Sequence, residues 1–340
     1  MKPKILITRQ VFPEIVEGLR ARFDVEHNDD DRPWPADELA RRLADKQGVL
    51  ATVMDRIDEA ALAAAPGLKV VSNIAVGTNN VDIAACTRRG ILVTNTPGVL
   101  DDTTADLTFA LLMAAARRVA EGDAMVRRGD WKLAFAMQSP LGTDVHHATL
   151  GILGMGRIGQ AIAKRAGGFD MRVLYHNRGR LPEADERRLN ATWVEKERLL
   201  AESDFVVVMV PYSPAVHHLI GAAEIARMKP TAILVNTARG GVVDDAALVE
   251  ALRAKRIAGA GLDVFEGEPK LDPGYLALPN AVLTPHVGSA TRATRLAMCE
   301  TAVANISAAL EGRAPPHLVN KELAQGAATR PRKSHSSASA

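Results

Sequence analysis

The sequence predicts an α/β protein built from two doubly wound domains, each with a parallel sheet covered by helices on both faces. Short apolar runs alternate with helical patterns along most of the chain. At 340 residues the chain is long enough for two domains, each with its own core. An apolar share of 47% with few aromatic residues is typical of α/β proteins and argues against a disordered or fibrous chain.

The charge balance and the two cysteines exclude several classes of protein. A net charge of +2, from 42 basic and 40 acidic residues, predicts no nucleic-acid or membrane partner. Cys86 and Cys299 have no metal-type spacing, so we expect free thiols in a reducing compartment and no metal site. The N-terminus enters a strand without a signal-peptide pattern, and we therefore expect a cytoplasmic protein.

Residues 149 to 165 carry the strongest local pattern, which is a strand, a glycine turn and a helix. The turn has the spacing G-x-G-x-x-G. Gly154 permits the tight turn, Gly156 allows close approach of a pyrophosphate, and Gly159 lets the helix pack on the strand. The N-terminus of the helix then offers free N–H groups to phosphates. The strand, the glycine turn and the helix together predict a Rossmann domain. The expected contacts are Gly154, Met155, Gly156, Arg157, Ile158 and Gly159.

The end of the next strand, residues 172 to 176, predicts which dinucleotide binds. An NAD site usually has an acidic residue here, on the ribose hydroxyls. This chain has Asn177 and Arg178, with Arg180 close behind. No acid repels a 2′-phosphate, and a guanidinium can bind one, so we expect NADPH to be preferred. The alternative is a surface arginine beside a site that also accepts NADH.

The first domain has predicted strands at residues 5–8, 24–27, 48–52, 69–73 and 91–95 and no phosphate-type turn. After its fourth strand, the backbone N–H groups of Val76 and Gly77 are placed to bind a substrate carboxylate, although an ordinary βα turn fits equally well. A hinge at Thr96-Pro97-Gly98 and a long helix over about 102–118 follow. A helix over about 291–310 and an edge at 318–320 close the pattern, before a basic Ala/Ser-rich tail expected to be disordered.

The second domain continues with predicted strands at residues 205–210, 232–236, 259–264 and 282–284. Reduction of a 2-oxo acid needs an arginine that binds the carboxylate, a histidine that protonates the carbonyl, and a carboxylate that charges the histidine. Arg239, Glu268 and His286 follow successive strands and supply one of each. Taken singly, each also fits an ordinary loop residue.

Four motifs together resemble the D-isomer-specific 2-hydroxyacid dehydrogenase family, from the first strand to about Asn320. They are Thr149 to Gly159, Asn236-Thr-Ala-Arg-Gly-Gly, Gly261-Leu-Asp-Val-Phe-Glu-Gly-Glu-Pro and Thr284-Pro-His-Val-Gly-Ser-Ala-Thr. Within the family, the stretches Val99 to Leu107 and Tyr175 to Arg178 resemble the glyoxylate and hydroxypyruvate reductase branch, which includes 2-ketogluconate reductases. One departure is His146-His147-Ala148-Thr149, where relatives often have His-Gly-Lys-Thr.

The resemblance implies that Arg239 binds substrate, His286 is the acid/base and Glu268 orients it, with Leu100 beside the substrate. It also implies cofactor contacts from Thr104, Pro211, Thr237, Ala238, Asp263 and Gly288. A flavodoxin-like substrate domain of residues 1–98 and 290–321 would surround a nucleotide domain of residues 99–289, with a tail at 322–340. The family usually forms homodimers through the nucleotide domains.

The sequence therefore predicts a reductase of small 2-oxo acids that prefers NADPH, acting on glyoxylate, hydroxypyruvate or 2-ketogluconate. The alternative enzyme is an NAD-dependent D-3-phosphoglycerate or other D-hydroxyacid dehydrogenase, against which the missing acid after residue 176 argues. From another class, the same fold serves corepressors that sense dinucleotides. Neither the preferred substrate nor the physiological direction follows from the sequence.

Overall fold

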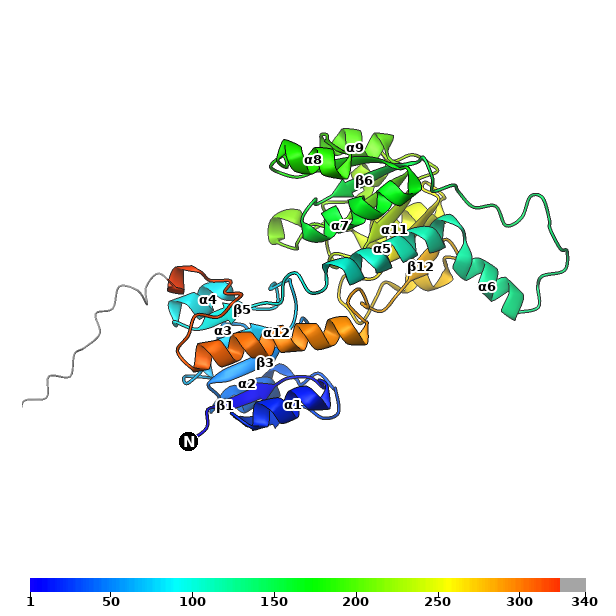
Figure 1. The fold of residues 1–340 in the computed structure, drawn as a ribbon. Helices are drawn as coiled ribbons and strands as arrows, with labels where there is room; N and C mark the ends of the chain where they lie inside the picture. Colours follow the sequence, from blue (N-terminus) through cyan, green and yellow to red (C-terminus); the bar gives the residue numbers. More distant parts are fainter. Residues whose placement is uncertain (325–340) are drawn as a thin grey trace, which may run out of the picture. The chain divides into compact units, whose positions relative to one another are not determined.

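The computed structural model describes residues 1–324 and divides the chain into two compact units. Unit 1 comprises Met1–Val99 and the residues from Arg292 onward, and unit 2 is Leu100–Thr291 (Figure 1). Each unit contains one sheet in which all the pairings between strands are parallel. The predicted fold class, two doubly wound α/β domains, is confirmed.

Unit 1 has a sheet of five strands in the order β2-β1-β3-β4-β5, with helices on both faces. Successive residues of β1 alternate between the faces, since Ile5 and Ile7 pack in one core and Leu6 in the other. Helices α1 and α12 cover the first face, and α2, α3 and α4 the second. The elements are β1 (Lys4–Ile7), α1 (Pro13–Arg20), β2 (Asp24–His27), α2 (Ala36–Leu43), β3 (Gly48–Ala51), α3 (Glu59–Ala63), β4 (Val70–Asn73), α4 (Ile83–Arg88), β5 (Leu92–Thr94) and α12 (Arg292–Leu310).

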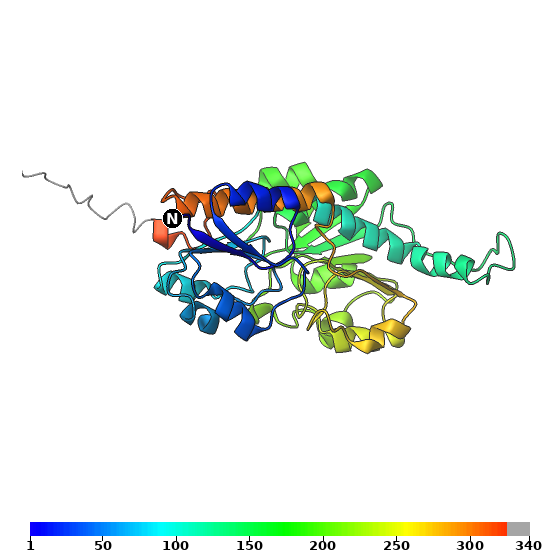
Figure 2. The same ribbon diagram turned by 90° about the horizontal axis from the view of Figure 1, so that it is seen from below.

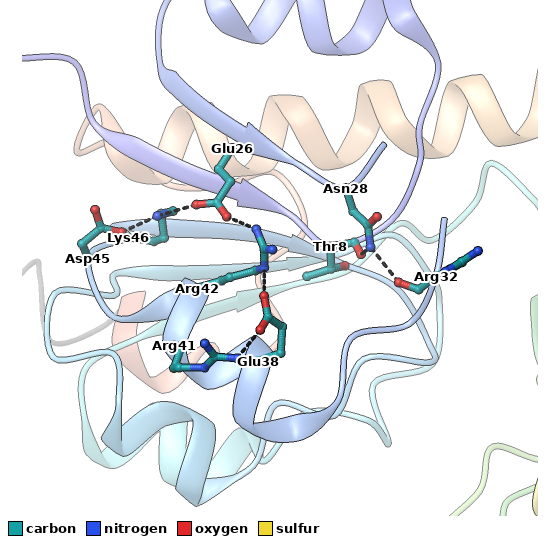
Figure 3. Close-up of polar contacts among 9 residues, drawn as sticks. All are labelled: Thr8, Glu26, Asn28, Arg32, Glu38, Arg41, Arg42, Asp45 and Lys46. Atoms are coloured by element: carbon teal, nitrogen blue, oxygen red, sulfur yellow. Dashed lines mark hydrogen bonds and ion pairs between the residues drawn. The ribbon is translucent and has the colours of Figure 1, made fainter. Parts of the chain in front are cut away.

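A charged network joins β2 to α2 and to the turn after it (Figure 3). Glu26 on β2 accepts from Arg42 on α2 and lies 2.9 Å from the nearly buried Lys46 ammonium. Arg42 also pairs with Glu38, and its guanidinium lies 4.3 Å from the Trp34 ring centroid. Because each cation has a carboxylate partner, the edge strand β2 is fixed to the unit despite its charged residues.

Unit 2 has a sheet of seven strands in the order β12-β11-β10-β9-β6-β7-β8. The order reverses direction between β6 and β9, which is the switch point at which doubly wound sheets bind ligands. Helices α5 and α7 pack on one face, and α9, α10 and α11 on the other. The elements are α5 (Asp101–Ala116), α6 (Val119–Arg127), β6 (Thr149–Leu153), α7 (Arg157–Ala166), β7 (Arg172–His176), α8 (Glu183–Leu189), β8 (Ala191–Trp193), α9 (Lys196–Glu202), β9 (Phe205–Val208), α10 (Ala222–Ile225), β10 (Ile233–Asn236), α11 (Asp245–Arg253), β11 (Gly259–Leu262) and β12 (Ala281–Leu283), with short 3₁₀ turns at Gly167–Phe169, Pro214–Val216 and Pro273–Ala277.

The sequence prediction differs from the structure mainly at element ends and in two places within unit 2. The edge strand β8 was not predicted, because the exposed Thr192 interrupts its apolar run. The helix expected over 102–118 ends at Ala116, where Arg118 takes a left-handed conformation with φ of 53°, and a separate helix α6 begins. Helix α6 and the stretch that follows it extend away from the sheet of unit 2 (Figures 1 and 2).

The edge strand predicted at residues 318–320, in the C-terminal part of unit 1, is present only as a single β-bridge. Leu318 forms an isolated antiparallel bridge with Thr94, and the Asn320 side chain accepts from the Val93 N–H at 2.9 Å. Of the expected disordered tail, residues 322–324 form a helical turn, and the remainder lies outside the described residues. Within residues 1–324, no helix is long and apolar enough to cross a membrane. A cytoplasmic location stays a prediction.

Candidate active site

The glycine turn lies between β6 and α7, at the carboxyl end of β6 and beside the switch point between β6 and β9. Gly154 has a φ of 103°, and a Cβ there would lie 2.6 Å from the Met209 carbonyl carbon. A Cβ on Gly159 would lie 2.4 Å from the Gly154 oxygen, so this glycine lets α7 pack against the turn. A Cβ on Gly156 would meet nothing within 4 Å. The turn is thus packed on its inner side and open at Gly156, where α7 begins, which fits a bound pyrophosphate.

Asn177 and Arg178 lie beside this turn, because Leu153 and His176 are paired in the sheet. The Asn177 side chain accepts from the Met155 N–H at 2.7 Å and so fixes the turn. Arg178 is exposed and makes no hydrogen bond or ion pair within residues 1–324. Its guanidinium is therefore available to an anion.

Arg180, by contrast, is paired with the buried carboxylate of Glu186, so its guanidinium is not free in the way that of Arg178 is. Its Nε and Nη2 donate to the two oxygens of Glu186 at 2.8 and 2.7 Å. Glu186 also accepts from the Tyr175 hydroxyl at 2.6 Å. The hydrogen bonds from Arg180 and Tyr175 lower the pKa of Glu186 to about 2. The sequence spacing did not show this pairing, because Glu186 is on the following helix.

The buried carboxylate of Asp263, just after β11, holds the segment that carries His286. Its Oδ1 accepts from the Thr284 hydroxyl at 2.6 Å and the Val287 N–H at 2.8 Å, and its Oδ2 accepts from the Gly288 N–H at 2.8 Å. The Asp263 carbonyl also accepts from the His286 N–H at 2.9 Å. His286 has a φ of 52°, a conformation that these bonds stabilise.

His286 and Glu268 are in direct contact. His286 Nδ1 lies 2.7 Å from Glu268 Oε2, with 30% and 20% of the two side chains exposed. A carboxylate at this distance attracts the protonated ring and fixes its orientation. Because Nδ1 is engaged, Nε2 is the nitrogen left to serve a substrate.

Arg239 follows β10 in a turn that is fixed from both sides. Asn236 accepts from the Ala238 N–H at 3.1 Å and donates to the Arg239 carbonyl at 3.3 Å. A Cβ on Gly240 would lie 1.8 Å from the Phe265 oxygen, so only glycine allows this turn to approach the segment that leads to Glu268. Burial lowers the pKa of Arg239, and the charge of Glu268 opposes this shift. The Arg239 guanidinium and the Glu268 carboxylate are therefore close enough for their charges to interact.

The other residues expected to contact the cofactor lie around the same edge of the sheet. Thr237, Ala238 and Thr104 are buried, and a hydroxyl pair at 2.6 Å joins Thr237 to Thr108, which also donates to the Thr104 carbonyl. Leu100, expected beside the substrate, is also buried, whereas Pro211 is exposed. The N–H groups of Met155 and Gly288 have partners within the chain, so any contact from these residues would use other atoms.

Val76 and Gly77 lie in unit 1, in the loop after β4. The Val76 carbonyl accepts from Asn95 and the Gly77 carbonyl accepts from Asn73, both at 2.8 Å. Within the described residues, neither backbone N–H of this pair donates a hydrogen bond. Two adjacent free donors on a backbone whose carbonyls are held can bind a carboxylate.

Two parts of the site were not anticipated from the sequence. Thr108 supports Thr237 from the adjacent helix, and Asn236 shapes the arginine turn. Asn236 carries a local signal, since Asn at a strand end favours a side-chain turn. Thr108 carries no such signal, because only the packing of α5 on the sheet brings it to Thr237.

Comparisons with known proteins agree with this geometry. Residues 109–288 match the family described as "D-isomer specific 2-hydroxyacid dehydrogenase, NAD binding domain". The chain is 49% identical over 327 residues to a glyoxylate reductase of Pyrococcus horikoshii, covering 95% of this chain and 97% of that protein.

Solved structures give the same result. A protein from Thermus thermophilus superposes with a TM-score of 0.86 at 48% identity, covering 93% of this chain and 99% of the other. An NADPH-dependent glyoxylate/hydroxypyruvate reductase from Sinorhizobium meliloti, solved with NADP and malonate, superposes with a TM-score of 0.84 at 32% identity, covering 94% and 97%.

Two glycine substitutions should separate folding from nucleotide binding. Gly159→Ala forces a Cβ against the Gly154 oxygen, and we expect it to cost about 1–3 kcal/mol of stability. Gly156→Ala places its methyl in open space, so the melting temperature should stay within a few degrees of wild type while dinucleotide binding weakens. Thermal unfolding and fluorescence titration with NADPH measure the two effects. Unchanged NADPH binding in Gly156→Ala would contradict the assigned position of the pyrophosphate.

Proposed function

Because this chain belongs to the D-isomer-specific 2-hydroxyacid dehydrogenase family, we propose that it reduces small 2-oxo acids to D-2-hydroxy acids and prefers NADPH. The proposed substrates are glyoxylate and hydroxypyruvate, with 2-ketogluconate as a third. The proposal is supported above all by the contact of His286 with Glu268, whose charge also acts on Arg239. These residues and the glycine turn follow strands of the same parallel sheet.

The proposed chemistry assigns one task to each side chain. When bound, the nicotinamide supplies a hydride to the carbonyl carbon. Arg239 binds the substrate carboxylate through its planar guanidinium and polarises the neighbouring carbonyl oxygen. His286 gives a proton from Nε2 to that oxygen as negative charge develops on it. Glu268 holds the ring through Nδ1 and stabilises its charged form before the transfer.

The free N–H groups of Val76 and Gly77 are proposed as further ligands for the substrate carboxylate. They fit this task because their carbonyls are held by Asn95 and Asn73. A small anion bound by two N–H groups gains two charge-assisted hydrogen bonds without reorganising the loop.

NADPH preference is supported by the free guanidinium of Arg178 and by the neutral side chain of Asn177. Asn177 replaces the carboxylate that would repel a 2′-phosphate, and its own oxygen is already used by the Met155 N–H. The Sinorhizobium meliloti relative, solved with NADP, is NADPH-dependent by name.

The direct test follows nicotinamide absorbance with the purified protein, offering NADPH and NADH against glyoxylate, hydroxypyruvate and 2-ketogluconate. We expect oxidation of NADPH with at least one of these acids, faster than that of NADH. Faster oxidation of NADH would leave the enzyme class intact and remove the cofactor preference. No turnover with any 2-oxo acid would refute the proposed reaction.

Replacing Arg178 should change cofactor preference without harming the enzyme. Arg178→Ala removes a charge-assisted contact worth about 1.5–3 kcal/mol, so the KM for NADPH should rise about 10- to 100-fold while that for NADH changes little. Arg180→Ala is the matched control, because Arg180 is paired with Glu186 and should not alter the preference. Equal losses with both cofactors in Arg178→Ala would contradict the assignment.

Replacing His286, the proposed proton donor, should lower turnover and leave cofactor binding unchanged. We expect His286→Ala to reduce kcat about 10²- to 10⁴-fold, with an unchanged dissociation constant for NADPH. Glu268→Gln should reduce kcat less, because the amide keeps an oxygen for His286 Nδ1 but loses the negative charge beside the ring. Steady-state kinetics, with NADPH binding measured by fluorescence, distinguish these results from misfolding. A His286→Ala enzyme with wild-type kcat would exclude His286 as the acid.

We also propose that the protein is a homodimer assembled through helix α6 and the stretch after it. Seven of the ten exposed large hydrophobic side chains among the described residues lie between Val119 and Leu141, including Phe135 at 90% exposure. Helix α6 has no buried residue of its own. An apolar surface this concentrated is typical of a protein interface, and the family resemblance favours a second copy as the partner.

A charge in this stretch should separate the two copies. Phe135→Asp places a carboxylate in the proposed interface, and size-exclusion chromatography with light scattering should then show a monomer where the wild type is a dimer. Leu276→Asp is the matched control, because Leu276 is 74% exposed in the same unit and lies outside the stretch. A wild-type monomer, or a dimer that survives Phe135→Asp, would contradict the assignment.

A further inference from the structure

Two adjacent histidines and a glutamate form a cluster that the proposed reaction does not use. His217 and His218 follow the Pro214–Val216 turn after β9, and Glu266 lies in the loop after β11. One donor atom from each of the three lies within 4.8 Å of the other two. The two imidazole rings stack with centroids 3.9 Å apart and planes 23° from parallel. The stacking brings both rings to one carboxylate.

Both histidines direct the same nitrogen to Glu266. Nε2 of His218 is 2.8 Å from Glu266 Oε2, and Nε2 of His217 is 3.8 Å from Glu266 Oε1. The other nitrogen of each ring faces an outer partner. Nδ1 of His217 is 3.4 Å from the Tyr212 hydroxyl, and Nδ1 of His218 is 3.7 Å from Asp244 Oδ2. In metal-binding histidines a hydrogen bond to the second nitrogen fixes the ring and makes the free nitrogen a better ligand. The Tyr212 contact is a hydrogen bond of this kind, and the Asp244 carboxylate is within ion-pair distance of His218.

The backbone that carries the cluster is held in place by hydrogen bonds. The His218 N–H donates to the Gly241 carbonyl at 2.8 Å, and the Glu266 N–H donates to the Asp245 carboxylate at 2.8 Å. A Cβ on Gly241 would lie 3.3 Å from His217 Nδ1, so this glycine leaves room for the ring. The three donors are thus kept together by the fold, although they come from two separate loops.

We propose that His217, His218 and Glu266 form a binding site for a divalent transition-metal ion of the Zn²⁺ class. Two imidazoles and one carboxylate are a ligand set that suits zinc, with a fourth position left for water. Donors around tetrahedral zinc are about 3.3 Å apart, so shifts of about 1 Å close the present spacing. Between 37% and 45% of each ligand side chain is exposed, which gives an ion access from solvent.

An ion at this site would join the loop after β9 to the loop that contains Glu268, two residues beyond Glu266. The inference is independent of the proposed reaction, because none of the three ligands takes part in it. It also differs from the expectation from the sequence, which gave no metal site. His218 and Glu266 are 48 residues apart along the chain, so only the fold brings them together.

The test uses the full-length protein without a histidine tag, stripped of metal and titrated with ZnCl₂ by calorimetry and with Co²⁺ by visible absorption. We expect one Zn²⁺ per chain and a Co²⁺ spectrum typical of four-coordination. His217→Ala and Glu266→Gln should each weaken Zn²⁺ binding at least about tenfold, and Asp244→Asn about tenfold through the outer contact.

Two controls locate the ion. The variant His146→Ala/His147→Ala removes another adjacent pair, whose rings meet edge to face at 5.2 Å, and it should leave binding unchanged. His286→Ala should also leave it unchanged. Absence of Zn²⁺ binding in the wild type, binding that survives Glu266→Gln, or binding that is lost in His286→Ala would overturn the proposal.

Discussion

The buried carboxylate of Asp263 joins the segments on which the candidate active site depends. The carboxylate accepts hydrogen bonds from Thr284, Val287 and Gly288, and the main-chain carbonyl of Asp263 accepts one from the His286 N–H. A buried carboxylate with this many donors is stable only if the surrounding loop keeps its shape. Asp263 therefore sets the left-handed backbone at His286 and, through it, the contact with Glu268. The resemblance suggested a cofactor contact for Asp263, and the structure shows this organising role in addition.

The parallel sheet of unit 2 explains why the remaining groups gather at one edge. Strands β6, β9, β10 and β11 are neighbours, so the residues that follow them lie side by side although they are distant in sequence. Close backbone approaches then determine the spacing. Gly159 brings α7 to the glycine turn, and Gly240 brings the arginine turn to the segment before Glu268. Both approaches exclude any side chain larger than hydrogen, which links the glycine positions directly to the geometry of the site.

Much of this arrangement was predictable from the sequence, because it depends on patterns that are local. Alternating strands and helices predicted both sheets, and the glycine spacing identified the central βα unit. What the sequence could not show are contacts set by packing between distant segments. The pairing of Arg180 with Glu186 depends on where α8 lies, and the cluster at His217, His218 and Glu266 depends on the contact of two loops. The edge strand β8 was missed because Ala191-Thr192-Trp193 is not a continuous apolar run.

Transfer of a labelled hydride is the most direct test of the proposed reaction, because the nicotinamide and the 2-oxo acid must then meet at one site. NADPH carrying deuterium at the reactive position of C4 would be incubated with hydroxypyruvate, and the product examined by NMR spectroscopy and by its chirality. We expect deuterium at C2 of a product with the D configuration. A product without deuterium at C2, or one with the L configuration, would contradict it.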